Sequence, residues 1–190
     1  MREREKPSAY ILAGGKSSRM GRDKALLPFG GYETLAEYQY DRLKRSGCFS
    51  GVFFSLKEQA LPFDAPYLRD ESETAAPIVA LKRILSAASQ ERVFVLAVDL
   101  PFFSGFERLI AQRGNIAMAR TISGSHPLCA IYHQSLADHF RRACASGDLS
   151  IKNALRSEAI AYVDFDEREL TNLNYEREYR LAFNAYPPVS

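Results

Sequence analysis

The chain has 190 residues, of which 46% are hydrophobic and 25% are charged. These values are ordinary for a globular protein and exclude a disordered tail, a collagen and a coiled-coil rod. Lys and Arg number 25 against 23 Asp and Glu, so the net charge is only +2 and gives no reason to expect nucleic acid as a partner. The length suits one domain, and we expect residues 1–190 to form a single one.

The cysteines and the lengths of the apolar runs indicate the cellular compartment of the protein. Cys48, Cys129 and Cys144 are odd in number and far apart, which excludes a disulfide framework and suits a reducing compartment. No apolar run approaches the ~18–20 residues that a membrane span needs. We therefore predict a cytoplasmic protein with no membrane partner.

The first half of the chain alternates predicted strands and helices. A strand over 9–13 leads into a loop rich in Gly, Ser and Arg, over residues 14–24. Thr34 is a predicted N-cap for a helix that ends near Ser46, with Gly47 just past its end. Strands over 51–56 and 67–69 follow, and Pro77 suits the first turn of the next helix.

The second half continues the alternation. The run 93–98 is apolar throughout, which is typical of a strand buried on both faces. Ser104 is the predicted cap of a helix that ends near Gly114. The remaining predicted strands cover 116–120, 128–132 and 159–163, and the remaining helices lie over about 136–147, from about 150 and from about 175. This order predicts an α/β, Rossmann-like domain of three layers, with a mostly parallel sheet and helices on both faces.

Ligands of such sheets bind beyond the carboxyl ends of the strands, which directs attention to the loop over 14–24, to Asp99, and to the loops before and after the last strand. The first is the loop over 14–24, in which Gly14 and Gly15 lack a Cβ and allow backbone N–H groups to approach a phosphate. Arg19 and Lys24 add two cations to the same loop. A triphosphate is the ligand that these parts suit. The alternative is an ordinary surface loop with a solvated Arg and Lys.

Two familiar phosphate-binding motifs do not account for this loop. A Walker A motif would need a glycine five residues before Gly15, and Tyr10 stands there. The dinucleotide-binding spacing G-x-G-x-x-G is also missing after the strand.

The second segment is Asp99, which follows the apolar strand. An ionised carboxylate at such a strand end needs a partner. Mg²⁺ is the expected one, since it prefers oxygen ligands and is usually held by one or two carboxylates plus substrate phosphates. The alternative is an aspartate that caps the following turn.

The longest motif resembles a known family. Residues 12–31 read LAGGKSSRMGRDKALLPFGG, which is similar to the L-A-G-G-x-S-x-R-M-G-x-D-K signature of the molybdenum cofactor guanylyltransferases, within the MobA-like nucleotidyltransferases. Weaker likenesses to the family follow in the same order over residues 76–81, 96–101, 126–128 and 163–174. The resemblance therefore extends over nearly the whole chain.

The resemblance implies Mg²⁺-dependent transfer of GMP from GTP to the terminal phosphate of molybdopterin or its molybdenum-loaded form, with release of pyrophosphate. It implies that Arg19 and Lys24 neutralise the triphosphate and that Asp99 holds the metal and contacts the nucleotide. The backbone of Leu12, Ala13, Gly14 and Gly15 would bind the base and phosphates.

Further residues receive roles from the resemblance alone. Asp70 would contact the nucleoside, although Glu71 and Glu73 lie close enough to leave the register open. The second substrate would be contacted by His126, Asn172 and Asn174. The alternatives are a plain surface acid at Asp70, a structural or solvent-facing His126, and asparagines that form turns.

Alternative functions stay open at this point. Ala76 and Ala80 stand where the family usually has glycine, which bears on base specificity. The first alternative is a related transferase that uses CTP or another phosphorylated acceptor. The second is a protein that binds nucleotide or pterin without turnover. The resemblance also implies, as protein partners, molybdopterin-delivery proteins or molybdoenzyme chaperones.

Overall fold

The structure, a computed structural model, describes residues 5–13, 23–57, 60–69, 74 and 76–173. The described residues form a seven-stranded sheet with the order β3-β2-β1-β4-β6-β5-β7. Only β6 runs antiparallel to its neighbours, which confirms the predicted mostly parallel sheet. The strands are β1 (Ser8–Leu12), β2 (Val52–Leu56), β3 (Tyr67–Arg69), β4 (Arg92–Ala97), β5 (Ile116–Thr121), β6 (Gly124–His133) and β7 (Ala161–Asp164).

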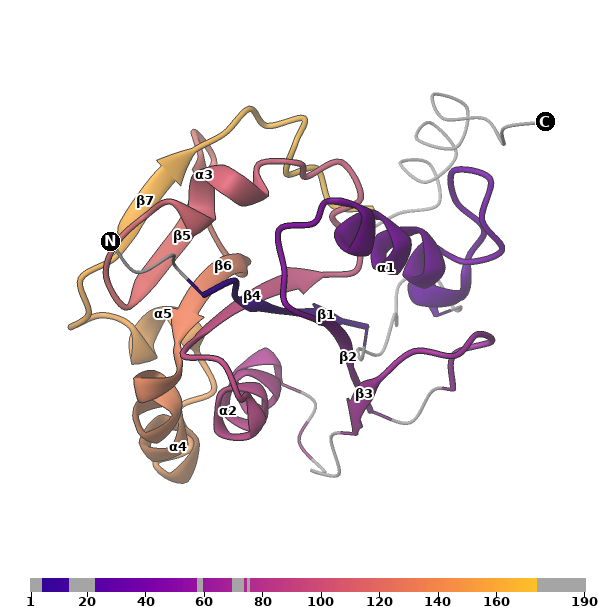
Figure 1. The fold of residues 1–190 in the computed structure, drawn as a ribbon. Helices are drawn as coiled ribbons and strands as arrows, with labels where there is room; N and C mark the ends of the chain where they lie inside the picture. Colours follow the sequence, from indigo (N-terminus) through magenta and orange to yellow (C-terminus); the bar gives the residue numbers. More distant parts are fainter. Residues whose placement is uncertain (1–4, 14–22, 58–59, 70–73, 75, 174–190) are drawn as a thin grey trace.

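Helices cover both faces of this sheet (Figure 1). One face carries α1 (Leu35–Arg45) and α3 (Phe106–Ile110), and the other carries α2 (Pro77–Ala87), α4 (Ala137–Ala145) and α5 (Ile151–Ala154). Two short 3₁₀ turns, η1 (Lys24–Leu26) and η2 (Gln134–Leu136), join these elements. A separate apolar core fills each side of the sheet, so the predicted three-layer architecture is confirmed.

Strand β4 lies at the centre of both cores. Its residues Val93 to Leu96 are completely buried. Phe94 and Leu96 belong to the core beneath α1, and Val93 and Val95 belong to the core beneath α2. Alternate side chains of a strand point to opposite faces, so an unbroken apolar run is what a doubly covered strand requires.

The predicted helix boundaries are confirmed for α1 and α2 and wrong for α3. The Thr34 hydroxyl accepts a hydrogen bond from the Glu37 N–H at 3.0 Å, and Gly47 follows the helix with a φ of +66°. Pro77 is the first residue of α2. Helix α3 begins after Gly105 rather than Ser104, with no side-chain cap, and it ends at Ile110, well before Gly114. The Arg92 guanidinium donates to the carbonyl oxygens of Ile110, the last residue of the helix, and of Gln112 just beyond it.

Strand β6 is longer than expected and takes in His126 and Pro127, which were predicted to precede a strand. Its pairing with β5 shifts between Met118 and Ala119. A proline has no N–H to give to a sheet and is tolerated at such an irregularity. The β5–β6 hairpin thus carries the amino end of β6 to the edge at which the parallel strands end.

The strand order reverses between β1 and β4. Strands β2 and β3 lie on one side of this pair, and β6, β5 and β7 lie on the other. Leu12 lies level with Ala97, and the Val98 N–H donates to the Leu12 carbonyl at 3.0 Å. The loops that leave these two strands therefore begin side by side, at the point where such sheets bind ligands.

Two further findings concern single segments. Among the described residues, no helix is long and apolar enough to cross a bilayer. The helix predicted from about Tyr175 lies outside the described residues.

Candidate functional site

Lys24 and Asp99 meet at the reversal point of the sheet. Lys24 begins η1, after the loop that leaves β1, and Asp99 follows β4 by two residues. Lys24 Nζ lies 3.5 Å from Asp99 Oδ2, and the two side chains are 16% and 22% exposed. The two predicted site residues are thus brought together from positions 75 residues apart in the chain.

Local capping holds Lys24 in place. The Asp23 carboxylate accepts a hydrogen bond from the Ala25 N–H at 3.0 Å and so caps η1. The Ala25 side chain is completely buried in the core beneath α1. One turn therefore has its cap and its buried anchor on either side of Lys24, which leaves the ammonium to face Asp99.

The environment of Asp99 favours an additional positive charge. Burial raises the pKa of its carboxyl above the usual value, and the Lys24 ammonium opposes that rise. At 3.5 Å the contact with Lys24 is longer than a typical charge-assisted hydrogen bond. A second cation near this carboxylate would stabilise its ionised form further.

A magnesium ion fits this arrangement. The described residues contain no group of three or more His, Cys, Asp or Glu side chains that could cage a metal. Mg²⁺ does not require such a cage, because one or two carboxylates and the substrate's phosphates usually suffice. Asp99 is the described carboxylate placed to serve in this way.

The segment that carries Asn172 lies against the Asp99 loop. The Leu173 N–H donates to the Asp99 carbonyl oxygen at 2.9 Å, so Asn172 lies beside the main chain of Asp99. A hollow of about 360 Å³ opens at the same place and is lined by Phe102, Arg168, Glu169 and Thr171. The structure therefore brings Asn172 into the neighbourhood of Lys24 and Asp99.

His126 has different surroundings. Its ring is half-buried in β6, and burial lowers the pKa of the imidazole while the nearby Glu167 carboxylate opposes that change. Within the described part of the chain, no hydrogen bond or ion pair links His126 to Lys24, Asp99 or Asn172. Its predicted contact with a second substrate stays a prediction.

The remaining predicted residues divide into two groups. Leu12 and Ala13 are described, and their backbone serves the sheet: the Leu12 carbonyl accepts from Val98, and the Ala13 N–H donates to the Ser55 carbonyl at 3.2 Å. The others lie outside the described residues, and their roles stay predictions: Gly14, Gly15, Arg19, Asp70 and Asn174.

A known protein family matches most of the chain. Residues 9–163 match the family described as "MobA-like NTP transferase domain". The chain belongs to this family.

Relatives of this MobA-like chain carry a more specific name. It is 36% identical over 180 residues to the molybdenum cofactor guanylyltransferase of Campylobacter jejuni strain RM1221, covering 90% of this chain and 93% of the relative. It is 31% identical over 183 residues to the enzyme of the same name from Helicobacter pylori strain G27, covering 90% and 89%.

A solved structure shares the fold. Molybdopterin-guanine dinucleotide biosynthesis protein A from Archaeoglobus fulgidus superposes with a TM-score of 0.77 at 20% identity, covering 94% of this chain and 97% of that one. At this identity the likeness supports the nucleotidyltransferase α/β fold alone.

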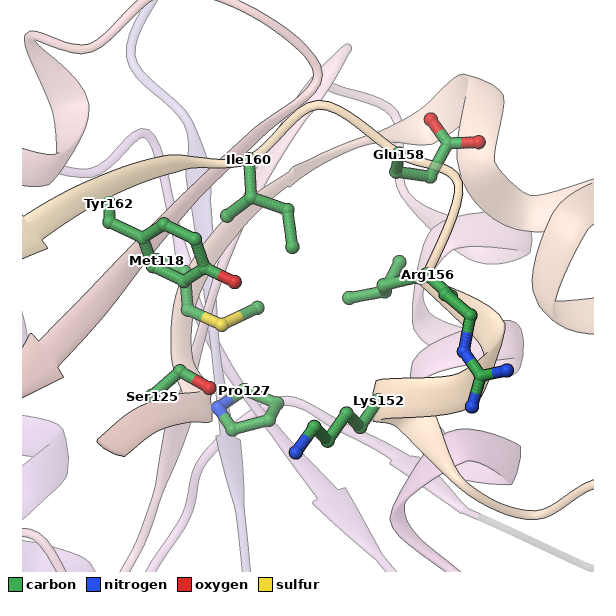
Figure 2. Close-up of a pocket in the computed structure, with 9 residues that line it drawn as sticks. Met118, Ser125, Pro127, Lys152, Arg156, Glu158, Ile160 and Tyr162 are labelled. Carbon is green, nitrogen blue, oxygen red and sulfur yellow. The ribbon is translucent and has the colours of Figure 1, made fainter. Parts of the chain in front are cut away.

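The MobA-like domain has a second hollow, whose lining includes neither Lys24 nor Asp99 (Figure 2). It measures about 270 Å³ and lies between α5 and the strands β5, β6 and β7. Met118 and Tyr162 line one side, and Lys152 and Arg156 line the other. None of the predicted site residues lines it.

Two side chains near the site were missed by sequence reasoning. Gln39 and Arg42 lie on α1 and bind the loop that carries Asp99. The signal was present in the α1 pattern, because Gln39 occupies the buried face with Leu35, Ala36 and Leu43. A polar residue on an apolar helix face needs an internal hydrogen-bond partner, and that partner was not sought.

Proposed function

We propose that this MobA-like chain transfers GMP from GTP to the terminal phosphate of molybdopterin and releases pyrophosphate. The observation that carries the proposal is the meeting of Lys24 and Asp99 beyond the adjacent ends of β1 and β4. An ammonium and a carboxylate at this point suit a nucleoside triphosphate and its metal ion. The names of the relatives favour GTP and molybdopterin as the two substrates.

The reaction needs no nucleophile from the protein. An oxygen of the acceptor phosphate forms a new bond to the α-phosphorus of GTP. The bond between that phosphorus and the oxygen bridging to the β-phosphate breaks, and pyrophosphate leaves with the bonding electrons. Positioning and charge neutralisation are therefore the main tasks of the side chains, as in other phosphoryl transfers.

Lys24, Asp99 and Asn172 each have a task in the proposed reaction. Lys24 would neutralise charge on the triphosphate and on the departing pyrophosphate. Asp99 would hold the metal ion. A bound Mg²⁺ would supply positive charge to the phosphate oxygens. Asn172 would contact the acceptor or the metal with its amide.

The family typically uses a divalent metal ion, and we propose Mg²⁺ for this chain. Arg19 would act beside Lys24, the loop containing Gly14 and Gly15 would bind phosphates, and Asp70 would contact the nucleoside. Molybdopterin-delivery proteins or molybdoenzyme chaperones as partners, and a cytoplasmic location, stay predictions.

The test is a comparison of nucleotides. The purified protein is incubated with Mg²⁺, molybdopterin and either GTP or CTP, and pyrophosphate release and product mass are measured. We expect release with GTP that depends on molybdopterin, together with a guanine dinucleotide product. Release with CTP alone would assign the cytidylyl reaction instead. Binding of GTP without any release would contradict the proposed transfer to this acceptor.

A further inference from the structure

Two polar side chains of α1 point from a buried helix face toward the loop that follows β4. Gln39 is completely buried, and Arg42 is largely buried. The same helix face carries the core residues Leu35, Ala36 and Leu43. Apolar side chains would pack at these positions without any need for hydrogen bonds, so the contacts of Gln39 and Arg42 require an explanation.

The contacts of both residues converge on the loop over 98–103. Gln39 Nε2 donates to the Val98 carbonyl at 3.0 Å. Arg42 Nη2 donates to the Leu100 carbonyl at 3.4 Å, and Arg42 Nη1 donates to the Phe103 carbonyl. Arg42 Nη2 also binds Gln39 Oε1, which joins the two side chains into one network. The residues on either side of Asp99 are therefore held by α1.

The Arg42 guanidinium keeps its charge without an ion pair. Among the described residues, none of the carboxylates forms a salt bridge with it. The carbonyl oxygens and the rings of Tyr38 and Phe106, at 5.6 and 5.5 Å, surround it instead. Burial lowers the pKa of Arg42 to about 10, so the group remains protonated at neutral pH. Its two Nη groups donate to three oxygens from a rigid planar group, an arrangement that the single ammonium of lysine does not reproduce.

The rest of the loop is bound from the two neighbouring segments. The Val98 N–H donates to the Leu12 carbonyl, and the Asp99 carbonyl accepts from the Leu173 N–H. With α1 holding Val98 and Leu100, the main chain of Asp99 is restrained on each side. Its carboxylate is then the part of the residue that faces Lys24.

We propose that Gln39 and Arg42 are positioning residues, which hold the Asp99 carboxylate where it binds the metal ion of the nucleotide. This inference rests on the proposed function, because it gives Asp99 that task. Neither side chain has to touch the substrate. A displacement of about 1 Å at a reacting group lowers rates by roughly 10²-fold, so a network behind the site can affect catalysis strongly.

The chain offers a matched control at the other end of β4. Arg92 donates to the carbonyl oxygens of Ile110 and Gln112 at 2.8 and 3.0 Å. Arg42→Lys and Arg92→Lys therefore remove the same kind of bidentate grip on two carbonyls. They differ in whether the carbonyls belong to the loop that carries Asp99, and Arg42→Lys also removes the hydrogen bond to Gln39 Oε1.

The primary measurement is binding of Mn²⁺ in the presence of GTP, followed by electron paramagnetic resonance of the free ion, with thermal unfolding measured alongside. We expect Arg42→Lys to weaken Mn²⁺ binding roughly 10-fold, as loss of a group that orients a metal ligand does. We expect Arg92→Lys to leave Mn²⁺ binding within about 2-fold, whatever its effect on the unfolding temperature. Equal Mn²⁺ affinities for wild type and Arg42→Lys would overturn the inference.

A second variant keeps the inference testable if Arg42→Lys does not fold. Gln39→Met has a similar volume, lacks the donor to Val98, and is expected to weaken Mn²⁺ binding in the same direction. A further comparison uses Asp99→Asn as the background. If Arg42 acts through Asp99, then Arg42→Lys changes Mn²⁺ affinity by less than about 2-fold in that background. A full additional loss there would show that Arg42 acts by another route and would overturn the inference.

The same experiment separates the inference from the proposed function. A large loss of Mn²⁺ affinity in Asp99→Asn with none in Arg42→Lys or Gln39→Met would overturn the positioning role alone. Unchanged Mn²⁺ affinity in Asp99→Asn would overturn both the metal role of Asp99 and the inference built on it.

Discussion

The two ends of β4 are held in similar ways and serve different purposes. At the amino end, Arg92 binds the carbonyl oxygens of Ile110, the last residue of α3, and of Gln112 just beyond it. At the carboxyl end, Arg42 and Gln39 of α1 bind the loop over 98–103. Only the second loop lies where the strand order reverses, and it carries Asp99 toward Lys24.

The two ends of β4 differ in where the bound loop lies in the sheet, and not in the strength of the hydrogen bonds that hold it. Arg42 and Arg92 each donate to two main-chain carbonyls, and in both cases the hydrogen bonds join β4 or its following loop to a helical segment. In a parallel sheet the carboxyl ends of the strands are where ligands bind, so a shift of the loop changes the site there. The same shift at the amino end changes only how well the strand and helix hold together. We therefore expect substitutions to affect catalysis at the carboxyl end of β4 and stability at the amino end.

The largest effect is expected for Asp99→Asn. The substitution keeps the shape of the side chain and removes the charge that would hold the metal ion. We expect kcat to fall roughly 10²–10³-fold, or about 3–4 kcal/mol of transition-state stabilisation. Steady-state pyrophosphate release at saturating GTP and Mg²⁺ measures it, with thermal unfolding as the control. Near-normal kcat would show that Asp99 has no role in the reaction.

A smaller loss is expected for Lys24→Met. Methionine keeps most of the stem and removes the ammonium that faces Asp99 and the expected triphosphate. A hydrogen bond to a charged group is worth about 1.5–3 kcal/mol, so kcat/KM for GTP should fall roughly 10–10²-fold. The matched control is Lys152→Met, at the hollow beside α5, whose lining includes neither Lys24 nor Asp99. If the two variants lose equal activity, the phosphate role of Lys24 is wrong.

At the opposite end of β4, Arg92→Met should reduce stability and leave chemistry intact. It removes two hydrogen bonds to main-chain carbonyls, and we expect the free energy of unfolding to fall by about 1–3 kcal/mol. Urea unfolding measures this change, and kcat at 25 °C tests whether the chemistry is unaffected. A tenfold fall in kcat in the folded variant would break the contrast between the two ends.

The smallest effect is expected for Thr34→Ala, at the start of α1. It removes the cap on the Glu37 N–H and should cost about 1 kcal/mol of stability. Since Gln39 and Arg42 lie at least a turn further along α1, Mn²⁺ affinity should stay within about 2-fold of wild type. A larger change would mean that the whole helix, rather than the two polar side chains, positions the loop.

Much of this site was predictable because the relevant signals are local. The apolar run of β4 predicted a doubly buried strand, and the rule that ligands bind beyond the carboxyl ends of the strands pointed to Asp99 and to the loop over 14–24. The strand order, which the sequence did not predict, brings Lys24 and Asp99 together. Thr34, Pro77 and Gly47 predicted helix ends correctly, because capping depends on adjacent residues.

Other features depend on contacts between distant segments and were beyond local reasoning. The carbonyl oxygen of Ile110, where α3 ends early, is bound by Arg92, which lies on β4. The length of β6 follows from a shift in its pairing with β5, at which Pro127 is tolerated. Gln39 and Arg42 look like ordinary polar residues of an amphipathic helix until the loop over 98–103 is placed against them.

The most direct test of the account follows the phosphates of GTP. Wild-type protein is given Mg²⁺, molybdopterin and GTP labelled at either the α- or the γ-phosphate, and the labelled products are separated. The account predicts that the α-label enters the pterin product and that the γ-label leaves in pyrophosphate. Transfer of the γ-label to the acceptor, or no transfer of the α-label while GTP is bound, would contradict nucleotidyl transfer at the Lys24–Asp99 site.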